Sequence, residues 1–147
     1  MVCYPSHWHA VHVIIGQNER VAAWMFEIGQ AHPMQYNLAI GLSLDGKELC
    51  GGILFTNYNG SDVEVHFYGP GLLKRRIVRT IFYIALTHFR VNRLTVRTRK
   101  EHMARGVIKL GAIYEGVVRR LYGPTDSPQH AGHQFAFFRE RIEELAR

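Results

Sequence analysis

Short apolar runs separated by turn-forming dipeptides make up the middle of the chain. The runs Leu38 to Leu44 and Glu48 to Tyr58 are joined by Asp45-Gly46, a dipeptide that favours the two-residue type I′ turn of a β-hairpin. Asn59-Gly60 repeats this signal before a third run, Asp62 to Tyr68. The pattern therefore predicts three consecutive antiparallel strands.

The third strand alternates between apolar and polar positions. Its two faces carry Val63, Val65 and Phe67 on one side, and Glu64, His66 and Tyr68 on the other. Antiparallel sheets often leave one face in water, so the polar face has two interpretations, a solvated surface or a functional one.

Helical spacing of apolar residues predicts a helix on each side of this meander. After a strand from Ala10 to Ile15, Asn18 can cap a helix whose apolar stripe is Val21, Ala22, Trp24, Met25 and Ile28. A second helix follows Gly69-Pro70-Gly71, with its stripe at Leu73, Ile77, Ile81, Ile84, Ala85 and His88.

The last third of the chain alternates strands and helices. The expected elements are a strand from Leu94 to Thr98, a helix from Glu101 to Lys109, a strand from Ala112 to Leu121, a loop over 123–132, a strand from His133 to Phe138, and a helix from Arg139. The order is β-α-β-β-β-α-β-α-β-β-α. We expect an α/β fold with a mixed, mostly antiparallel central sheet flanked by helices.

Length and composition narrow the class of protein. A chain of 147 residues with 47% hydrophobic and 20% charged residues is typical of one globular domain, here 1–147. The absence of a long apolar segment or a signal sequence predicts a cytoplasmic protein with no membrane partner. Two cysteines, Cys3 and Cys50, exclude a disulfide framework, and the nine histidines lack the spacing of a metal site, so no metal is expected.

Positive charge is concentrated in one segment. Residues 74–120 hold 13 Lys and Arg against two acids, a local net charge of +11 in a protein of +6. Four of these cations, Lys74, Arg75, Arg76 and Arg79, crowd the first turns of the second helix, where the helix dipole already disfavours cations. The surplus predicts a polyanionic ligand, either nucleic acid or a phosphate-rich cofactor.

Several segments together resemble a known family. LGAIYEGVVRR, from Leu110 to Arg120, is similar to a recurring motif of the GNAT superfamily of acetyl-CoA-dependent N-acetyltransferases. GGILFTNYNGSDVEVHF followed by RRIVRTIFYIALTHFRVNRLTV resembles the subgroup of that family encoded by bacteriophages and prophages. The resemblance covers roughly residues 36–122. It implies a single-domain GNAT-like fold and direct transfer of an acetyl group from acetyl-CoA to a primary amine.

The resemblance also implies where coenzyme A binds. Backbone groups of Phe67 and Tyr68 would hold the pantetheine arm. The family's Gly-containing pyrophosphate loop falls on 73–78, where Arg76 and Val78 occupy both glycine positions. Side chains there would crowd the phosphates. The residues expected at the coenzyme are therefore Lys74, Arg75, Arg76, Ile77, Val78 and Arg79, with His102 near the position of a family Asn.

Catalysis by direct transfer requires a base for the amine and an acid for the leaving thiolate. Glu64 and His66 are the candidate bases, Glu64 by its family-like position and His66 by its intrinsic pKa. Tyr68 is the candidate acid, because Val107 stands where the family often has a Tyr. The alternative is a nucleic-acid-binding or nucleobase-modifying protein of the same fold that uses the basic segment 74–120. The acceptor amine and the oligomeric state stay open, and a homodimer paired through the aromatic final strand is one of the alternatives.

Overall fold

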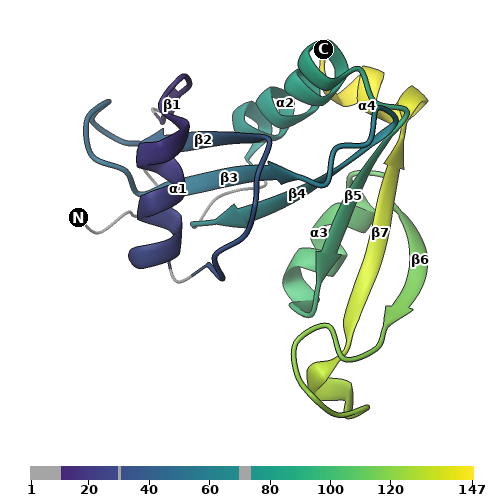
Figure 1. The fold of residues 1–147 in the computed structure, drawn as a ribbon. Coiled ribbons are helices and arrows are strands. Elements are labelled where there is room, and N and C mark those ends of the chain that lie inside the picture. The colour runs from purple at the N-terminus through teal and green to yellow at the C-terminus, as the bar shows by residue number, and fades with distance from the viewer. Residues whose placement is uncertain (1–10, 30, 70–73) are drawn as a thin grey trace.

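The computed structural model describes residues 11–29, 31–69 and 74–147, and its organising element is one seven-stranded sheet (Figure 1). The strands lie side by side in the order β1-β2-β3-β4-β5-β7-β6. Their bounds are β1 (His12–Ile14), β2 (Leu38–Ser43), β3 (Gly51–Thr56), β4 (Asp62–Tyr68), β5 (Arg93–Thr98), β6 (Ile113–Val118) and β7 (Gly132–Phe138).

The connections between strands confirm the expected fold. Every neighbouring pair is antiparallel except β4 and β5, which are parallel and joined by a helical crossover. The helices are α1 (Asn18–Glu27), α2 (Arg75–Ile84), α3 (Glu101–Lys109) and α4 (Arg139–Leu145). A π-helical segment (Ala85–Phe89) extends α2, and a 3-10 turn (Pro128–His130) lies in the loop between β6 and β7. The predicted order of strands and helices is therefore correct.

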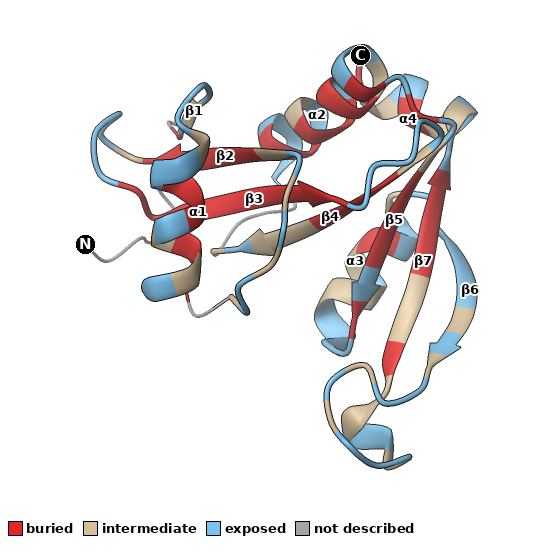
Figure 2. Ribbon diagram, in the orientation of Figure 1, coloured by how far each residue is buried: buried red, intermediate tan, exposed pale blue. Residues whose placement is uncertain are grey.

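The two faces of the sheet carry different helices. Helix α1 packs on β2 and β3, where Val21, Ala22 and Met25 join Ala39 and Leu54 in a small core. The larger core lies on the opposite face, under α2, α3 and α4. Figure 2 shows buried residues along β2, β3, β5 and β7. Residues paired across β3 and β4 share a face, so Glu64, His66 and Tyr68 lie on the α1 side of the sheet.

Two details of α1 differ from the sequence-based expectation. Asn18 does not cap the helix, because its side-chain Oδ1 accepts a hydrogen bond from the Ala39 N–H of β2 at 3.1 Å. Ile28, assigned to the buried stripe, is 61% exposed. The helix instead sits down onto a pair of glycines, Gly41 and Gly52, which face each other across β2 and β3.

The β2–β3 hairpin is confirmed, but the prediction of a two-residue turn is wrong. The ladder ends at Leu42 and Gly51, which leaves a wider loop instead of a two-residue turn. Asp45 organises this loop, since its Oδ1 accepts hydrogen bonds from the backbone N–H groups of Lys47 and Glu48 at 2.8 and 2.9 Å. A carboxylate that bonds the backbone two and three residues ahead replaces the two-residue turn.

Candidate functional site

The sheet opens between its two parallel strands. The β4–β5 ladder covers three residue pairs, from Asp62 and Arg93 to Glu64 and Thr95. Beyond Glu64 the strands diverge, as Figure 1 shows, although β4 continues to Tyr68 and β5 to Thr98. From Val65 onward, the backbone N–H and C=O groups of β4 that face β5 therefore lie outside the ladder. A ligand can form hydrogen bonds with these groups.

Four side chains meet at the point where the strands separate. The Nε2 atom of His66 lies 2.9 Å from Glu64 Oε2 and 2.8 Å from Thr56 Oγ1. On the other side of the carboxylate, Arg97 Nε of β5 lies 3.2 Å from Glu64 Oε1. The Glu64 side chain is only 9% exposed, whereas that of His66 is 30% exposed. Sequence alternation placed Glu64 and His66 on one face, and the structure joins them into one hydrogen-bonded unit.

The electrostatics of this unit separate the two candidate bases. Burial raises the pKa of Glu64, but the hydrogen bond from His66 and the charges of His66 and Arg97 outweigh it, so the net pKa is lowered. Glu64 is therefore a carboxylate at neutral pH and only accepts hydrogen bonds. Nε2 of His66 then carries the proton that it donates to Glu64, and in the neutral form of the imidazole Nδ1 is the acceptor. Of the two, His66 is the group that can take a proton from an amine.

A second group of ion pairs lies on the same face of the sheet, next to the opening between β4 and β5. Thr95 donates its hydroxyl hydrogen to Asp62 at 2.8 Å. Arg93 forms a bidentate pair with Glu115 of β6 and lies 3.6 Å from Asp62. The guanidinium of Arg93 lowers the pKa of Glu115. Gln134 of β7 accepts from Arg97 and donates to Glu115, so it links this group to the Glu64 unit. Sequence reasoning missed this network, although the alternation of Arg93, Thr95 and Arg97 was its signal.

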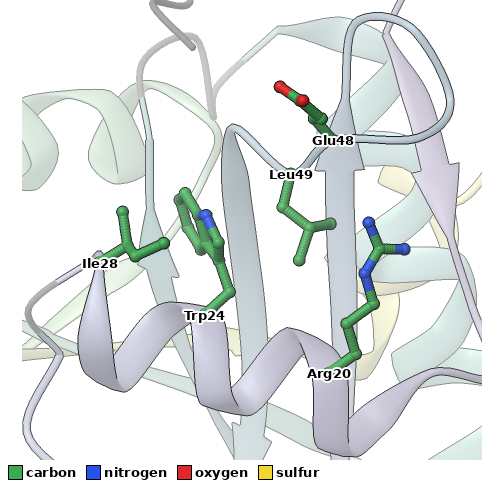
Figure 3. Close-up of a pocket in the computed structure, with 5 residues that line it drawn as sticks. All are labelled: Arg20, Trp24, Ile28, Glu48 and Leu49. Carbon is green, nitrogen blue, oxygen red and sulfur yellow. The ribbon is translucent and has the colours of Figure 1, made fainter.

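Tyr68 lies at the end of β4, 41% exposed, with its ring in edge contact with Trp24 of α1 at 5.5 Å between centroids. Trp24, assigned from the sequence to the apolar stripe of its helix, also lines a pocket of about 350 Å³ with Arg20, Ile28, Glu48 and Leu49 (Figure 3). In that view the α1 side chains point toward the loop that carries Glu48 and Leu49. Tyr68 is thus on the predicted face but two residues beyond His66 along the strand.

The four cations predicted for coenzyme A gather at the start of α2. Lys74 is the N-cap residue, and it is exposed, as are Arg75, Arg76 and Arg79. No carboxylate in the described ranges lies within ion-pair distance of any of them. Arg75 and Arg79 line a groove of about 400 Å³ together with Glu144 and Leu145 of α4. Helix-terminal N–H groups beside unpaired cations form a surface suited to phosphate.

Other predicted coenzyme residues are placed differently. The side chains of Ile77 and Val78 are buried in the core, and the Val78 N–H donates to Lys74 O at 2.9 Å. Phe67 points to the α2 side, into an apolar space of about 10 Å³, the room of one water molecule at most. His102 is exposed on the first turn of α3. The expected loop residue Leu73 lies outside the described residues.

One aromatic residue that the sequence analysis did not single out lies over the same face. Tyr122, in the loop after β6, stacks under Arg99, whose guanidinium carbon is 4.9 Å from the ring centroid. Burial raises the pKa of Tyr122, and the charges of Arg99, Glu64 and Arg97 act on the same hydroxyl. The Arg99–Tyr122 stack thus joins the end of β5 to the loop after β6. Only tertiary contact reveals this, because the residue sits in a turn-rich loop.

The histidines weighed for metal binding are engaged elsewhere. His130 Nδ1 bonds Thr125, and His133 Nδ1 bonds the Tyr114 hydroxyl at 2.9 Å. Within the described ranges, no three His, Cys, Asp or Glu side chains are grouped so that they could hold a metal ion. His7 and His9 lie outside those ranges. The described helices are also too short or too polar to cross a bilayer.

Comparison with solved structures identifies proteins of similar architecture. The spermidine/spermine N-acetyltransferase SpeG of Vibrio cholerae matches with a TM-score of 0.72 at 8% identity, over 95% of this chain and 99% of its own. A candidate acetyltransferase from T. thermophilus matches at 0.59 and 19% identity, over 74% and 62%. An acetyltransferase of the GNAT family from Bacillus anthracis matches at 0.53 and 17%, over 69% and 66%. The chain thus spans less than two thirds of the second protein and about two thirds of the third.

Comparison of the amino-acid sequence with protein families and with curated proteins finds no match. No protein-family model matches the chain, and no curated protein is similar to it in sequence. At sequence identities of 8 to 19%, the likeness to these structures shows the fold alone, and the activity has to be argued from the site. The strand order, the parallel β4–β5 pair and the structural neighbours agree that this chain has the fold of the GNAT acetyltransferases.

Proposed function

We propose that the protein is an N-acetyltransferase that moves an acetyl group from acetyl-CoA directly to a primary amine. The observation that carries this proposal is the opened β4–β5 edge with His66 beside it, bonded through Nε2 to a buried carboxylate. An extended acyl chain can pair with the free edge of β4, and an amine beside it can pass its proton to Nδ1 of His66. The structural neighbours named as acetyltransferases support the same reaction.

Each residue has a distinct role in this proposal. His66 accepts the proton of the attacking amine, and Glu64 positions the imidazole and stabilises the imidazolium that forms. Tyr68 donates a proton to the leaving thiolate, and the backbone of Phe67 and Tyr68 bonds the pantetheine arm. Transfer forms an amide bond to the acetyl carbon and breaks its thioester bond, which releases coenzyme A.

The cations at the start of α2 fit the phosphates of coenzyme A. Lys74, Arg75, Arg76 and Arg79 supply charge in place of the backbone cradle that glycines would offer. The first-turn N–H groups of α2 remain available, whereas the Val78 N–H is used inside the helix. We place the pyrophosphate and the 3′-phosphate here, with His102 at the edge of the same site. The bacteriophage subgroup, the cytoplasmic location and a homodimer remain predictions from the sequence.

Calorimetric titration with acetyl-CoA tests the coenzyme site. We expect one-to-one binding that weakens several-fold in Arg75→Ala and in Arg76→Ala, because each removes a charge-assisted contact to phosphate. Arg105→Ala is the matched control, since Arg105 is an exposed arginine of α3 paired with Glu101. Equal affinity in all variants would refute this placement. Absence of binding, together with salt-dependent affinity for oligonucleotides, would favour the nucleic-acid alternative.

A further inference from the structure

The charge balance of the α1-side face bears on which amine the site accepts, an inference that rests on the proposed function. Three carboxylates, those of Asp62, Glu64 and Glu115, lie on this face beside the opening, and Asp126 lies in the loop between β6 and β7. Each of them is already held by arginine: Asp62 and Glu115 by Arg93, Glu64 by Arg97, and Asp126 by Arg119 and Arg120. An acceptor with several positive charges would have to displace one of these partners before it could bind there.

Arg99 is different from the other arginines of this face. It follows β5 directly, and no acid of the described residues forms an ion pair with it. Its two contacts are the Tyr122 ring, at 4.9 Å, and a long approach of 3.5 Å to Gln129 O. The guanidinium therefore keeps most of its N–H groups free for an outside acceptor.

Tyr122 holds this guanidinium in place. The Tyr122 N–H donates to His130 O at 2.9 Å, which ties the residue to the base of its loop. A Cβ built on Gly132 would lie 3.0 Å from the Tyr122 ring, so the ring packs directly on β7. An arginine stacked on a fixed aromatic ring loses little freedom when it binds an anion.

Arg97, two residues before Arg99 in the chain, supplies further N–H donors. Its Nε points to Glu64 and Gln134, and this leaves its terminal nitrogens for solvent or ligand. Residues two apart on a strand share a face and are separated by about 6.6 Å. Arg97 thus lies beside the carboxylate that His66 contacts, and Arg99, stacked on Tyr122, presents a second guanidinium group two residues further along the chain.

We infer that the acceptor is a primary amine that also carries an anionic group, a carboxylate or a phosphate, which Arg99 binds while the amine faces His66. Arg99 is then a specificity-determining residue, and Tyr122 is a positioning residue that acts through it. A compact anionic amine is favoured over a polyamine, because Asp62, Glu64 and Glu115, the acids beside the opening, are each engaged by arginine.

Matched acceptor pairs test the inference in acetylation assays that follow release of coenzyme A thiol. One pair is γ-aminobutyrate and butylamine, the other is O-phosphoethanolamine and ethanolamine, and spermidine represents polycations. We expect the anionic member of at least one pair to have the higher kcat/KM by about tenfold or more. Which pair responds distinguishes carboxylate from phosphate. Preference for spermidine or for the neutral-tailed amines would overturn the inference.

Variants assign the preference to Arg99. Arg99→Gln should reduce the preference to about threefold or less by raising KM, and Arg99→Lys should keep part of it. Tyr122→Phe should preserve the preference, whereas Tyr122→Leu should weaken it. Arg105→Gln, which removes one exposed arginine elsewhere, should leave it unchanged. A preference that survives Arg99→Gln intact would refute the assignment.

A binding experiment separates this inference from the proposed function. O-phosphoethanolamine and γ-aminobutyrate are titrated calorimetrically into the protein saturated with coenzyme A, without turnover. Heat that disappears in Arg99→Gln supports the anion site even if no acetyl transfer occurs. Absence of heat for both probes overturns it even if acetyl-CoA is bound and used.

Discussion

Replacing Glu64 with Gln would test whether the buried carboxylate is the centre of the site. The substitution keeps the shape of the side chain and one acceptor oxygen, and removes the charge that faces His66 and Arg97 at 2.9 and 3.2 Å. The contacts with His66 and Arg97 would lose the carboxylate charge, at a cost of about 1–3 kcal/mol in the free energy of unfolding at pH 7. We expect a cost in the lower half of this range, because Arg97 can turn toward water and be hydrated once the carboxylate charge is removed. For a domain of this size the loss corresponds to a fall in Tm of about 2–12 °C.

The pH dependence of this difference follows from the lowered pKa of Glu64. A carboxyl whose pKa is depressed by folding contributes stability above its unfolded pKa, here near the ordinary 4.5, and loses it as pH falls through the folded value. The wild-type protein should therefore exceed Glu64→Gln in stability at pH 7. The difference should shrink steadily below about pH 4.5, because the protonated carboxyl and the amide are then both neutral.

Urea unfolding at pH 7 and at several values below pH 4.5 provides the measurement. Glu101→Gln is the matched control, because Glu101 is exposed on α3 and pairs with Arg105 across one turn. That control should stay within about 0.5 kcal/mol of the wild type. If Glu64→Gln differed from the wild type by the same amount at pH 7 and at pH 3, the ion-pair reasoning would be wrong.

Two further predictions concern the support of α1 and the adjoining loop. Gly52→Ala should destabilise the protein by about 1–3 kcal/mol, because the new Cβ would lie 2.6 Å from Met25 Sδ of α1. In thermal unfolding, the double variant Gly52→Ala, Met25→Ala should lose less stability than the sum of the losses of the two single variants. Strict additivity of the two losses would contradict the packing argument. Asp45→Ala should increase hydrogen exchange at the Lys47 and Glu48 amides. These hydrogen bonds hold the pKa of Asp45 at about 2, so wild-type protection should persist on acidification to near that pH, and a loss of protection near pH 4 would argue against them.

Local pattern was sufficient for most elements of this fold. The alternation over residues 62–68 and the helical spacing over 101–109 predicted β4 and α3 with the bounds that the structure has. These elements depend on hydrophobic period and on turn residues, both of which act within a few positions. The errors fall where a distant partner intervenes. Asn18 bonds β2 instead of capping α1, and the predicted two-residue turn is replaced by the Asp45 loop.

The candidate site shows the same division. The sequence by itself determined that Glu64, His66 and Tyr68 share one face of a strand, because side chains alternate along β structure, and that cations crowd the start of α2. Only the tertiary structure decided that Glu64 is buried between His66 and Arg97, and that Tyr122 carries Arg99 over the same face. These partners come from β5 and from the loop before β7, dozens of residues away. The Glu64–Arg97 contact depends on the parallel β4–β5 pairing that a helical crossover creates, and the Arg99–Tyr122 contact depends on the antiparallel pairing of β5 with β7; no local pattern encodes either pairing.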